Sequence, residues 1–315
     1  MKTATPSIAT IILNWNGKED TCNCIQSVLE IDFPNHEVTV VDNGSQDGSV
    51  EYIKERFPEL TVIETGANLG YAGGNNKGIS YALSKDFDYV FILNNDTVVD
   101  QSILDRFIEA SKDNPEAGVF GAKIYYLSEP QKIWFAGSTY VPKYALFASD
   151  GFGKTDEQYD QNEVKEIGYA CGCAMLVKAE VFRKIGLLEE KYFLNWEEID
   201  FCTRAKKASF QCVIVPEAHV WHKISASFKN GEEGLLRQYF QTRNRLFWIE
   251  RNFTFPERAT IFFKSVLPEV KEYILNYFNP SSNSGQRTKA IVCLVALKDY
   301  FLRNFGDCPL WIRSI

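Results

Sequence analysis

The first third of the chain alternates apolar, β-branched runs with segments of helical character, and this alternation constrains the fold more than any other feature. Continuous apolar runs are typical of strands that are covered on both faces. Four such runs are predicted to be strands: 8–13, 38–41, 60–64 and 89–93. Three segments are predicted to be the intervening helices: 18–31, 49–57 and 75–84. Strands and helices in this order build βαβ units, so the sequence predicts an α/β fold with a parallel sheet.

Three of the predicted strands end in polar side chains. These side chains are Asn14 and Asn16 after the first strand, Asp42 and Asn43 after the second, and Asn94, Asn95 and Asp96 after the fourth. Parallel sheets bind ligands beyond the carboxyl ends of their strands, so we expect the site at this edge.

The acids at these strand ends have two interpretations each. Asp96 suits a divalent cation that bridges a diphosphate, since such a cation takes one or two carboxylates and leaves its other positions to phosphate and water. The alternative for Asp96 is an Asx-turn that caps a helix starting near Asp100. Asp42 suits hydrogen bonding to a base or ribose, and its alternative is a plain strand-to-helix turn.

A glycine-rich and amide-rich segment, ANLGYAGGNNKG at 67–78, precedes the third predicted helix. Small residues let the backbone approach a ligand, and the N–H groups at a helix start favour phosphate or sugar oxygens. The spacing matches neither GxGxxG nor GxxxxGK[ST], which excludes dinucleotide-binding and P-loop assignments. A flexible surface turn is the alternative.

A helix is predicted to begin at Trp196, and its first turn is acidic. Glu197 and Asp200 share one face of it, and the neighbouring tryptophan suggests a partly closed pocket that raises a carboxyl pKa, as a general base requires. The alternative is that these acids only complement the helix dipole. Downstream, His219 and His222 are expected on opposite faces of an extended segment, so that His222 either completes a metal site or is structural.

The second half of the chain has a less regular pattern. Irregular strands are predicted at VFGAKIYY and KIWFAGSTY, followed by a loop at 150–162, and this half is expected to shape the second substrate's site. The end of the chain is predicted to be helical at 233–251, at 257–277 with a break near Pro268, and at 287–304.

Composition excludes several classes of function. The formal net charge is −7 and no block of five Lys or Arg occurs, so nucleic-acid partners are not expected. The eight cysteines form no CxxC pairs, which favours buried thiols in a reducing compartment over a zinc site. No signal peptide and no apolar run of the roughly 20 residues needed for a spanning helix are recognised, so a cytoplasmic protein is expected.

Taken together and in this order, these segments resemble the family-2 inverting glycosyltransferases of the GT-A fold, especially bacterial rhamnosyltransferase-like members. The resemblance covers about residues 8 to 250. The segments that carry it are IILNWNG, VVDNGSQDGS, NLGYAGGNNKG, FILNNDTVV, GYACGCAMLVKAEVF, FLNWEEIDFCTRAKKASF, VWHKISAS and QYFQTRNRLF.

The resemblance implies a mainly parallel GT-A sheet flanked by helices in a catalytic domain over residues 1–227. The nucleotide-sugar half of that domain is expected to end at about 117, the acceptor half to cover 118–227, and a C-terminal helical region to cover 228–315. The implied nucleotide-sugar-binding residues are Asn14, Asn16, Asp42, Asn68, Gly70, Gly74, Asn76, Asn95 and Arg243. The implied ligands of Mg²⁺ or Mn²⁺ are Asp96 and His222, and the expected catalytic acids are Glu198, Glu197 and Asp200.

Within that set, Glu198 is the implied general base, and Arg243-Asn244 match a late basic motif of uncertain role. Two residues depart from the family pattern. Asn94 replaces the first acid of the metal motif, which implies a weaker cation site. Glu198 stands where the family has Asp, which adds one methylene of reach.

The expected reaction is a single displacement that inverts the anomeric carbon. The expected donor is dTDP-L-rhamnose, with a UDP-hexose as the alternative, and the expected acceptor is a cell-surface glycan such as O-antigen on a lipid carrier. The C-terminal helices are expected to rest on the inner face of the plasma membrane, to pair two subunits as a homodimer, or to pack on the catalytic domain. The rival functions are a non-catalytic nucleotide-sugar-binding module of an assembly complex and a nucleotidyltransferase, for which the N-terminal region offers only Lys18 as a phosphate-gripping cation.

Overall fold

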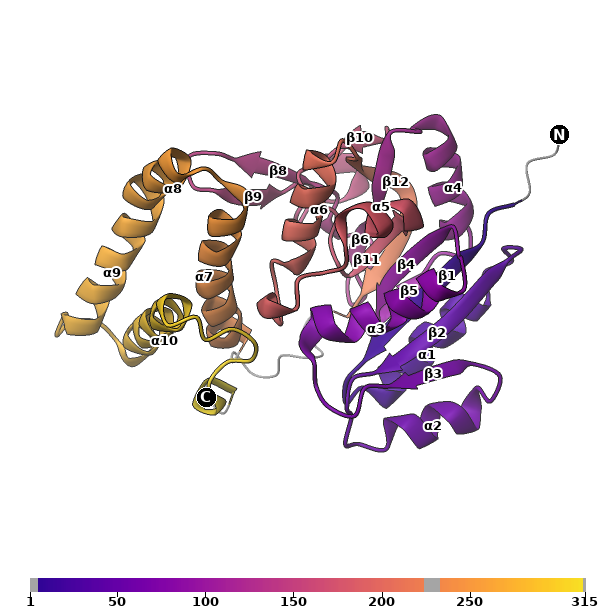
Figure 1. Cartoon of the computed structure of the whole chain (residues 1–315), viewed down its shortest axis with the longest axis horizontal. Helices are drawn as coiled ribbons and strands as arrows, with labels where there is room; N and C mark the ends of the chain where they lie inside the picture. Colours follow the sequence, from indigo (N-terminus) through magenta and orange to yellow (C-terminus); the bar gives the residue numbers. More distant parts are fainter. Residues whose placement is uncertain (1–4, 224–232, 314–315) are drawn as a thin grey trace.

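The computed structural model describes residues 5–223 and 233–313 of the chain. The strands are β1 (Ile8–Asn14), β2 (His36–Asp42), β3 (Thr61–Glu64), β4 (Tyr89–Asn94), β5 (Thr97–Val99), β6 (Ala117–Tyr126), β7 (Ile133–Phe135), β8 (Ser138–Val141), β9 (Leu146–Ser149), β10 (Lys165–Glu166), β11 (Ala174–Lys178) and β12 (Gln211–His222). The helices up to β12 are α1 (Lys18–Leu29), α2 (Ser49–Arg56), α3 (Gly70–Ser84), α4 (Ile103–Asp113), α5 (Ala179–Ile185) and α6 (Glu197–Lys207), with short 3₁₀ turns η1 (Asp156–Gln158) and η2 (Glu190–Tyr192). The fold is α/β, as predicted, with a large central sheet flanked by helices (Figure 1).

The N-terminal part of the sheet is parallel. The strand order is β10-β12-β6-β11-β4-β1-β2-β3, and β4, β1, β2 and β3 all pair in parallel. The register sets Asn14 opposite Asp42 and Leu13 opposite Asn94, so the polar strand ends meet at one edge. The βαβ prediction for this region is confirmed.

The remaining strands form a mixed sheet. β11 pairs antiparallel with both β4 and β6, and β6 pairs parallel with β12. The segment of β11 was expected only as part of a sequence motif and not as a strand. It is buried between two neighbours, and five residues give too little periodicity to identify a strand from sequence.

The C-terminal region is helical. It comprises α7 (Glu233–Asn252), α8 (Phe255–Ile261), the π-helical turn η3 (Phe262–Val266), α9 (Leu267–Phe278), α10 (Ser284–Phe301) and α11 (Leu310–Arg313). The break expected near Pro268 is this π turn, which immediately precedes it. Proline lacks an N–H and crowds the carbonyl four residues earlier, and a widened turn accommodates both effects. The predicted domain boundary at 227/228 lies outside the described residues.

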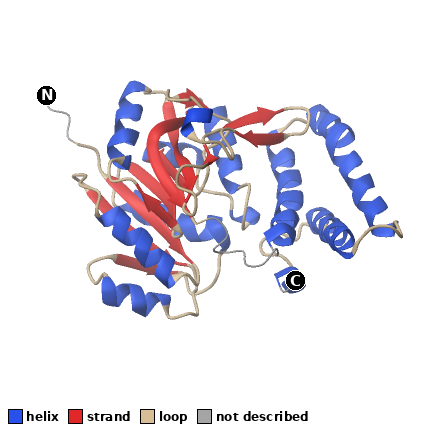
Figure 2. Ribbon diagram, turned by 180° about the vertical axis from the view of Figure 1, so that it is seen from behind, coloured by secondary structure: helices blue, strands red, loops and turns tan. Residues whose placement is uncertain are grey.

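A cluster of buried aromatic side chains joins the C-terminal helices to the sheet domain. Tyr192 and Trp196, which precede α6, pack with Phe247 and Trp248 of α7. Beyond α7, helices α8, α9 and α10 extend to one side of the molecule in both views (Figures 1 and 2). In the described segments, none of the helices combines the length and apolar character needed to cross a bilayer.

Candidate active site

The ends of β1, β2 and β4 form a hydrogen-bonded cluster. Asn14 donates from Nδ2 to Asp42 Oδ2 at 2.7 Å, and its Oδ1 accepts from Asn95 Nδ2 at 3.2 Å. The other oxygen of Asp42 accepts from the Ser45 N–H at 2.9 Å, and Asn16 Oδ1 accepts from the Gln46 N–H at 2.7 Å. The structure therefore brings together four of the predicted nucleotide-sugar residues, and Asp42 also organises the turn that was its alternative role.

The glycine-rich segment lies beside this cluster. Asn43 follows β2 and donates from Nδ2 to Asn68 Oδ1 at 3.2 Å and to the Gly70 carbonyl at 3.0 Å. Gly70 has φ of 73°, and a Cβ there would collide with the Phe193 carbonyl oxygen, so glycine is required. Asn68 and Gly70 thus border the strand-end cluster through Asn43, one of the polar residues predicted at the end of the second strand.

Gly74 and Asn76 serve the packing of α3. A Cβ on Gly74 would collide with the Leu13 side chain. Asn76 donates from Nδ2 to the Leu188 carbonyl at 3.0 Å and accepts from the Leu188 N–H at 3.1 Å. These contacts hold α3 against the sheet and against the chain before η2, and they use the amide of Asn76 internally.

Asp96 and His222 lie side by side where β4 and β12 end. Nε2 of His222 is 3.0 Å from Oδ1 of Asp96, and both side chains are about 10% exposed. Within residues 5–223 and 233–313, neither Asp96 Oδ1 nor His222 Nδ1 has a hydrogen-bond partner. The Asx-turn proposed as the alternative role of Asp96 is formed by Asp100 instead, whose Oδ1 accepts from the Ser102 N–H at 2.8 Å just before α4.

Asp96 Oδ1 and His222 Nε2 face each other without a hydrogen bond, and a carboxylate oxygen and an imidazole nitrogen placed in this way fit a divalent cation that takes its remaining ligands from a diphosphate and water. Among the described residues, no group of three or more His, Cys, Asp or Glu side chains could enclose a metal ion by itself. The fit is therefore to an open site that the substrate completes.

Glu197 and Glu198 are the first two residues of α6, and each carries a carboxyl group. Burial and the neighbouring Glu198 raise the pKa of Glu197 well above its ordinary value. Burial raises the pKa of Glu198 to about 7, although backbone N–H groups of the first helical turn oppose the shift. In the described part of the chain, Oε2 of each residue lacks a hydrogen-bond partner. Burial explains the pKa shifts, and the helix start explains why they are not larger for Glu198.

The segment before β11 connects the carboxyl pair to Asp96. Burial and then Glu198 raise the pKa of the Cys171 thiol. Burial, the Cys171 thiol and then Asp96 raise the pKa of Cys173. The Cys173 carbonyl accepts from the Asn94 N–H at 2.9 Å, so this segment also reaches the end of β4. The two acidic groups thus interact with opposite ends of one short stretch of chain.

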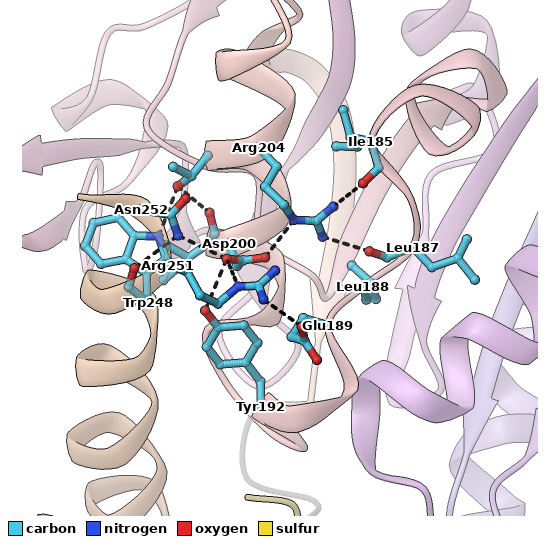
Figure 3. Close-up of polar contacts among 12 residues, drawn as sticks. Ile185, Leu187, Leu188, Glu189, Tyr192, Asp200, Arg204, Trp248, Arg251 and Asn252 are labelled. Atoms are coloured by element: carbon cyan, nitrogen blue, oxygen red, sulfur yellow. Dashed lines mark hydrogen bonds and ion pairs between the residues drawn. The ribbon is translucent and has the colours of Figure 1, made fainter. Parts of the chain in front are cut away.

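Asp200 was predicted to be catalytic, but the structure uses its carboxylate elsewhere. It is fully buried, and Oδ2 accepts from Arg204 Nε at 2.7 Å (Figure 3). Oδ1 accepts from Arg251 Nε at 3.1 Å, from Asn252 Nδ2 at 3.0 Å and from the Tyr192 hydroxyl at 3.2 Å. With both oxygens occupied, Asp200 joins α6 to α7 and is not free to take a substrate proton.

Arg243 was predicted to bind the nucleotide sugar, but it is fully buried between α7 and the segment before α6. Its guanidinium donates to the Tyr192 carbonyl at 3.2 Å and to the Asn304 carbonyl at 3.4 Å. The family-type motif of α7 therefore contacts protein backbone and not the strand-end cluster.

Asn195 is a site residue that sequence reasoning missed. It precedes α6 by two residues, and its Nδ2 is buried and has no hydrogen-bond partner among the described residues. Its φ of 64° is unusual for a side-chain-bearing residue, and no pattern in FLNWEEID reveals that conformation.

A cavity of about 560 Å³ lies away from these residues. Leu29, Phe33, His36 and Tyr81 are among its lining residues, at the amino end of β2. It is therefore separate from the candidate active site, which lies at the carboxyl ends of the strands.

Known proteins resemble this chain in sequence and in fold. The family profile described as Glycosyl transferase family 2 matches residues 9–186. A Haloferax volcanii protein named low-salt glycan biosynthesis hexosyltransferase Agl10 is 27% identical over 253 residues, which cover 78% of this chain and 76% of the relative. The N-acetylglucosaminyl-diphospho-decaprenol L-rhamnosyltransferase of Mycobacterium tuberculosis is 26% identical over 202 residues, which cover 59% of this chain and 66% of the relative.

A solved structure has the same fold. The mannosyltransferase PcManGT from Pyrobaculum calidifontis, in complex with GDP-Man and Mn²⁺, superposes with a TM-score of 0.60 at 14% identity, covering 96% of this chain and 88% of that chain. The resemblance to a GT-A glycosyltransferase fold is thereby confirmed. Since the family profile spans more than half of the chain, from β1 through α5, the protein belongs to glycosyl transferase family 2.

Proposed function

We propose that this glycosyltransferase moves a hexose from a nucleoside-diphosphate sugar to a hydroxyl group of a glycan acceptor, with inversion at the anomeric carbon. The observation that carries the proposal is the buried carboxyl pair at the start of α6, which has one unsatisfied oxygen on each residue. This carboxyl pair lies between the glycine-rich segment and the Asp96 region, and that position suits an acid that faces the acceptor.

Glu198 is proposed as the general base. A base that works near neutral pH needs a pKa near 7, and burial gives Glu198 that value. The two carboxyls repel each other when both are ionised, so the pair loses its two protons in separate steps and two adjacent buried charges are avoided. Glu198 then removes the proton of the acceptor hydroxyl while that oxygen attacks the face opposite the departing diphosphate.

Asp96 and His222 are proposed to hold Mg²⁺ or Mn²⁺. When bound, such an ion supplies neutralisation of the charge that develops on the leaving diphosphate. The Pyrobaculum mannosyltransferase of similar fold was solved with Mn²⁺, which supports this assignment. The strand-end residues Asn14, Asp42 and Asn95 are proposed to bind the nucleoside part of the donor.

The proposed donor is dTDP-L-rhamnose, and a UDP-hexose is the alternative. The name of the Mycobacterium relative supports rhamnose, and the name of the Haloferax relative specifies only a hexose. The decaprenol in the former name supports a lipid-linked glycan acceptor of a polysaccharide such as O-antigen. A module that only binds nucleotide sugars would show donor binding with neither transfer nor donor hydrolysis.

The C-terminal helices are proposed to contact the membrane that carries such an acceptor. α8, η3 and α9 expose Phe255, Phe263, Leu275 and Phe278 by 65% or more of their surface. Lys264 and Lys271 lie exposed among them, as is usual for helices at a lipid surface. Pairing of two subunits through the same face is the alternative.

The experiment that tests the base is Glu198→Gln. Transfer should fall by about 100-fold or more, because removal of a general base has an effect of that size. Donor binding, measured by calorimetry, should stay unchanged because the amide keeps the shape of the side chain. Glu197→Gln is the matched control, and it should retain more activity because Glu197 is already uncharged. If Glu198→Gln transfers sugar normally, the base is wrongly assigned.

A further inference from the structure

The segment that leads into α6 has an unusual backbone. Phe193, Asn195 and Trp196 have φ values of 63°, 64° and 80°. Side-chain-bearing residues rarely adopt positive φ, and such a conformation is unfavourable by itself and persists only where surrounding contacts compensate for it. Three of them within four residues require strong external support.

That support comes from α7. The side-chain amide of Asn244 donates to the carbonyls of Tyr192, Leu194 and Asn195 at 2.8, 2.9 and 2.9 Å. Arg243 adds a bond to the Tyr192 carbonyl and fixes Asn244 itself, since its Nε donates to Asn244 Oδ1 at 3.0 Å. Both α7 side chains are fully buried.

The character of Arg243 is informative. Burial lowers its pKa, and nearby Tyr239 and Asp299 oppose that shift. The Tyr239 hydroxyl links the two groups, since it accepts from Arg243 Nη1 at 3.3 Å and donates to Asp299 Oδ2 at 2.8 Å. A buried guanidinium is costly to maintain unless its donors are satisfied. Arg243 therefore supports the segment before α6 directly through the Tyr192 carbonyl and indirectly through Asn244 Oδ1, and it also bonds to the Asn304 carbonyl.

The opposite side of the segment meets the glycine-rich loop. The Tyr71 N–H donates to the Phe193 carbonyl at 2.6 Å, and Gly70 leaves room for that carbonyl. The strained segment is therefore held between the start of α3 and the middle of α7.

The conformation of this segment determines where the carboxyl groups of Glu197 and Glu198 lie. Trp196 is the N-cap of α6, so its backbone angles set the direction in which Glu197 and Glu198 leave the helix start. The Trp196 indole N–H donates to Gln241 Oε1 at 2.8 Å, which adds a third tether from α7.

We propose that Asn244, assisted by Arg243, is a positioning residue that holds 193–196 in its strained conformation and thereby keeps the Glu198 carboxyl buried and aimed at the acceptor. The inference rests on the proposed function of Glu198. It assigns to the late Arg-Asn motif a role through protein backbone.

Asn244→Ala tests the proposal, with Asn252→Ala as the matched control. Asn252 is also an α7 asparagine, but its amide bonds to Asp200 and to the Trp248 carbonyl. In Asn244→Ala we expect kcat to fall at least about tenfold, since small displacements of a reacting group have effects of that order, with the donor KM nearly unchanged. The acid limb of the kcat–pH profile should move down from about 7, toward the ordinary glutamate value of about 4.3, as the carboxyl becomes solvated.

The following outcomes distinguish the positioning role of Asn244 from the base role of Glu198. Asn252→Ala should leave the acid limb of the kcat–pH profile in place. The Asn244→Ala/Glu198→Gln double variant should lose no more activity than Glu198→Gln alone. If Glu198→Gln is inactive while Asn244→Ala changes only the yield of folded protein and leaves the limb unmoved, the positioning role is refuted and the proposed base stands. If Asn244→Ala does not fold, Arg243→Lys takes its place, because lysine keeps the positive charge but loses the planar guanidinium that bonds to Asn244 and to the Tyr192 carbonyl. An acid limb of the kcat–pH profile that stays in place in Arg243→Lys also refutes the positioning role.

Discussion

Glu197 and Glu198 place two buried acids next to each other at one helix start, and their unequal surroundings separate their protonation states. Burial raises the pKa of both groups, and the neighbouring Glu198 raises that of Glu197 further. The pair therefore keeps one proton over the pH range in which the other is lost. The pair combines a neutral neighbour with an ionisable base.

This separation predicts the pH dependence of transfer. A general base acts only when it is ionised, so kcat should rise with pH through the Glu198 pKa of about 7 and level off above it. Initial rates measured between pH 5.5 and 8.5, at saturating donor and constant Mn²⁺, give the profile. A rate that is flat across that range would contradict the assignment of Glu198.

The proposed role of Asp96 as a metal ligand predicts how donor binding depends on Mn²⁺. In a thermal-shift screen of nucleotide sugars, Mn²⁺ should increase the stabilisation that the preferred donor gives to the wild-type protein. Asp96→Asn should lose most of that increase, since one direct ligand is removed from a site that has few. Asp100→Asn is the matched control, because Asp100 forms an Asx-turn before α4 and asparagine forms the same turn. An Asp96→Asn protein that responds to Mn²⁺ as the wild type does would exclude Asp96 as a ligand.

The positions of the strand-end residues could be predicted from sequence, and the contacts of Arg243 on α7 and Asp200 on α6 could not. Asn14, Asp42 and Asp96 follow apolar runs, and the parallel order of those runs brings their ends to one edge of the sheet. Arg243 and Asp200 look like site residues because their type and spacing suit one. Their burial partners lie about 50 residues away along the chain, and no local pattern encodes such contacts.

At the scale of elements, α3 and α6 differ most from expectation. α3 was predicted to begin at Asn75, but it begins at Gly70, because glycines argue against a helix in isolation and the contact with Phe193 compensates. For α6, the prediction recognised the acidic first turn but not the link to α7 through Asp200.

The contacts of Asp200 that link α6 to α7 predict that loss of its charge lowers the free energy of unfolding. Asp200→Asn removes the charge that Arg204 and Arg251 face, and breaking a buried ion pair typically lowers the free energy of unfolding by about 3–5 kcal/mol. Urea denaturation followed by circular dichroism measures the change. Glu64→Gln is the control, because its pair with Lys54 is about half exposed and should contribute less than about 1 kcal/mol. A variant that is as stable as the wild type yet inactive would restore Asp200 to the catalytic set.

At the scale of the whole molecule, the C-terminal helices have two different surfaces. α7 packs on the sheet domain through its buried aromatic side chains, and α8 and α9 lie further out (Figure 1). The sequence predicted helices here but left open what they contact. Ile261 and Val266 join the aromatic cluster of α7, and Ser265 Oγ donates to the Tyr144 carbonyl at 3.2 Å, so packing accounts for part of the outer helices as well. It does not account for the large apolar side chains that α8, η3 and α9 expose to solvent.

The apolar side chains that α8, η3 and α9 expose to solvent predict membrane binding. Wild-type protein should float with anionic liposomes in a density gradient, and Phe263→Ser/Phe278→Ser should float much less, because each change removes an exposed aromatic ring from the lipid-facing side. Phe301→Ser is the control, since Phe301 is 68% exposed but lies on α10. Loss of a dimer in analytical ultracentrifugation, with no liposome binding by any form, would show that the surface pairs two subunits.

The dependence of 193–196 on Asn244 also limits how this enzyme can be divided or recombined. The family-matched region, 9–186, stops before α6, and the amide that shapes the entry to α6 comes from a later helix. A fragment trimmed after β12 would keep every strand-end side chain and still enter α6 with an untethered backbone. Chimeras that exchange donor specificity among relatives should therefore be joined after α7 and not before it.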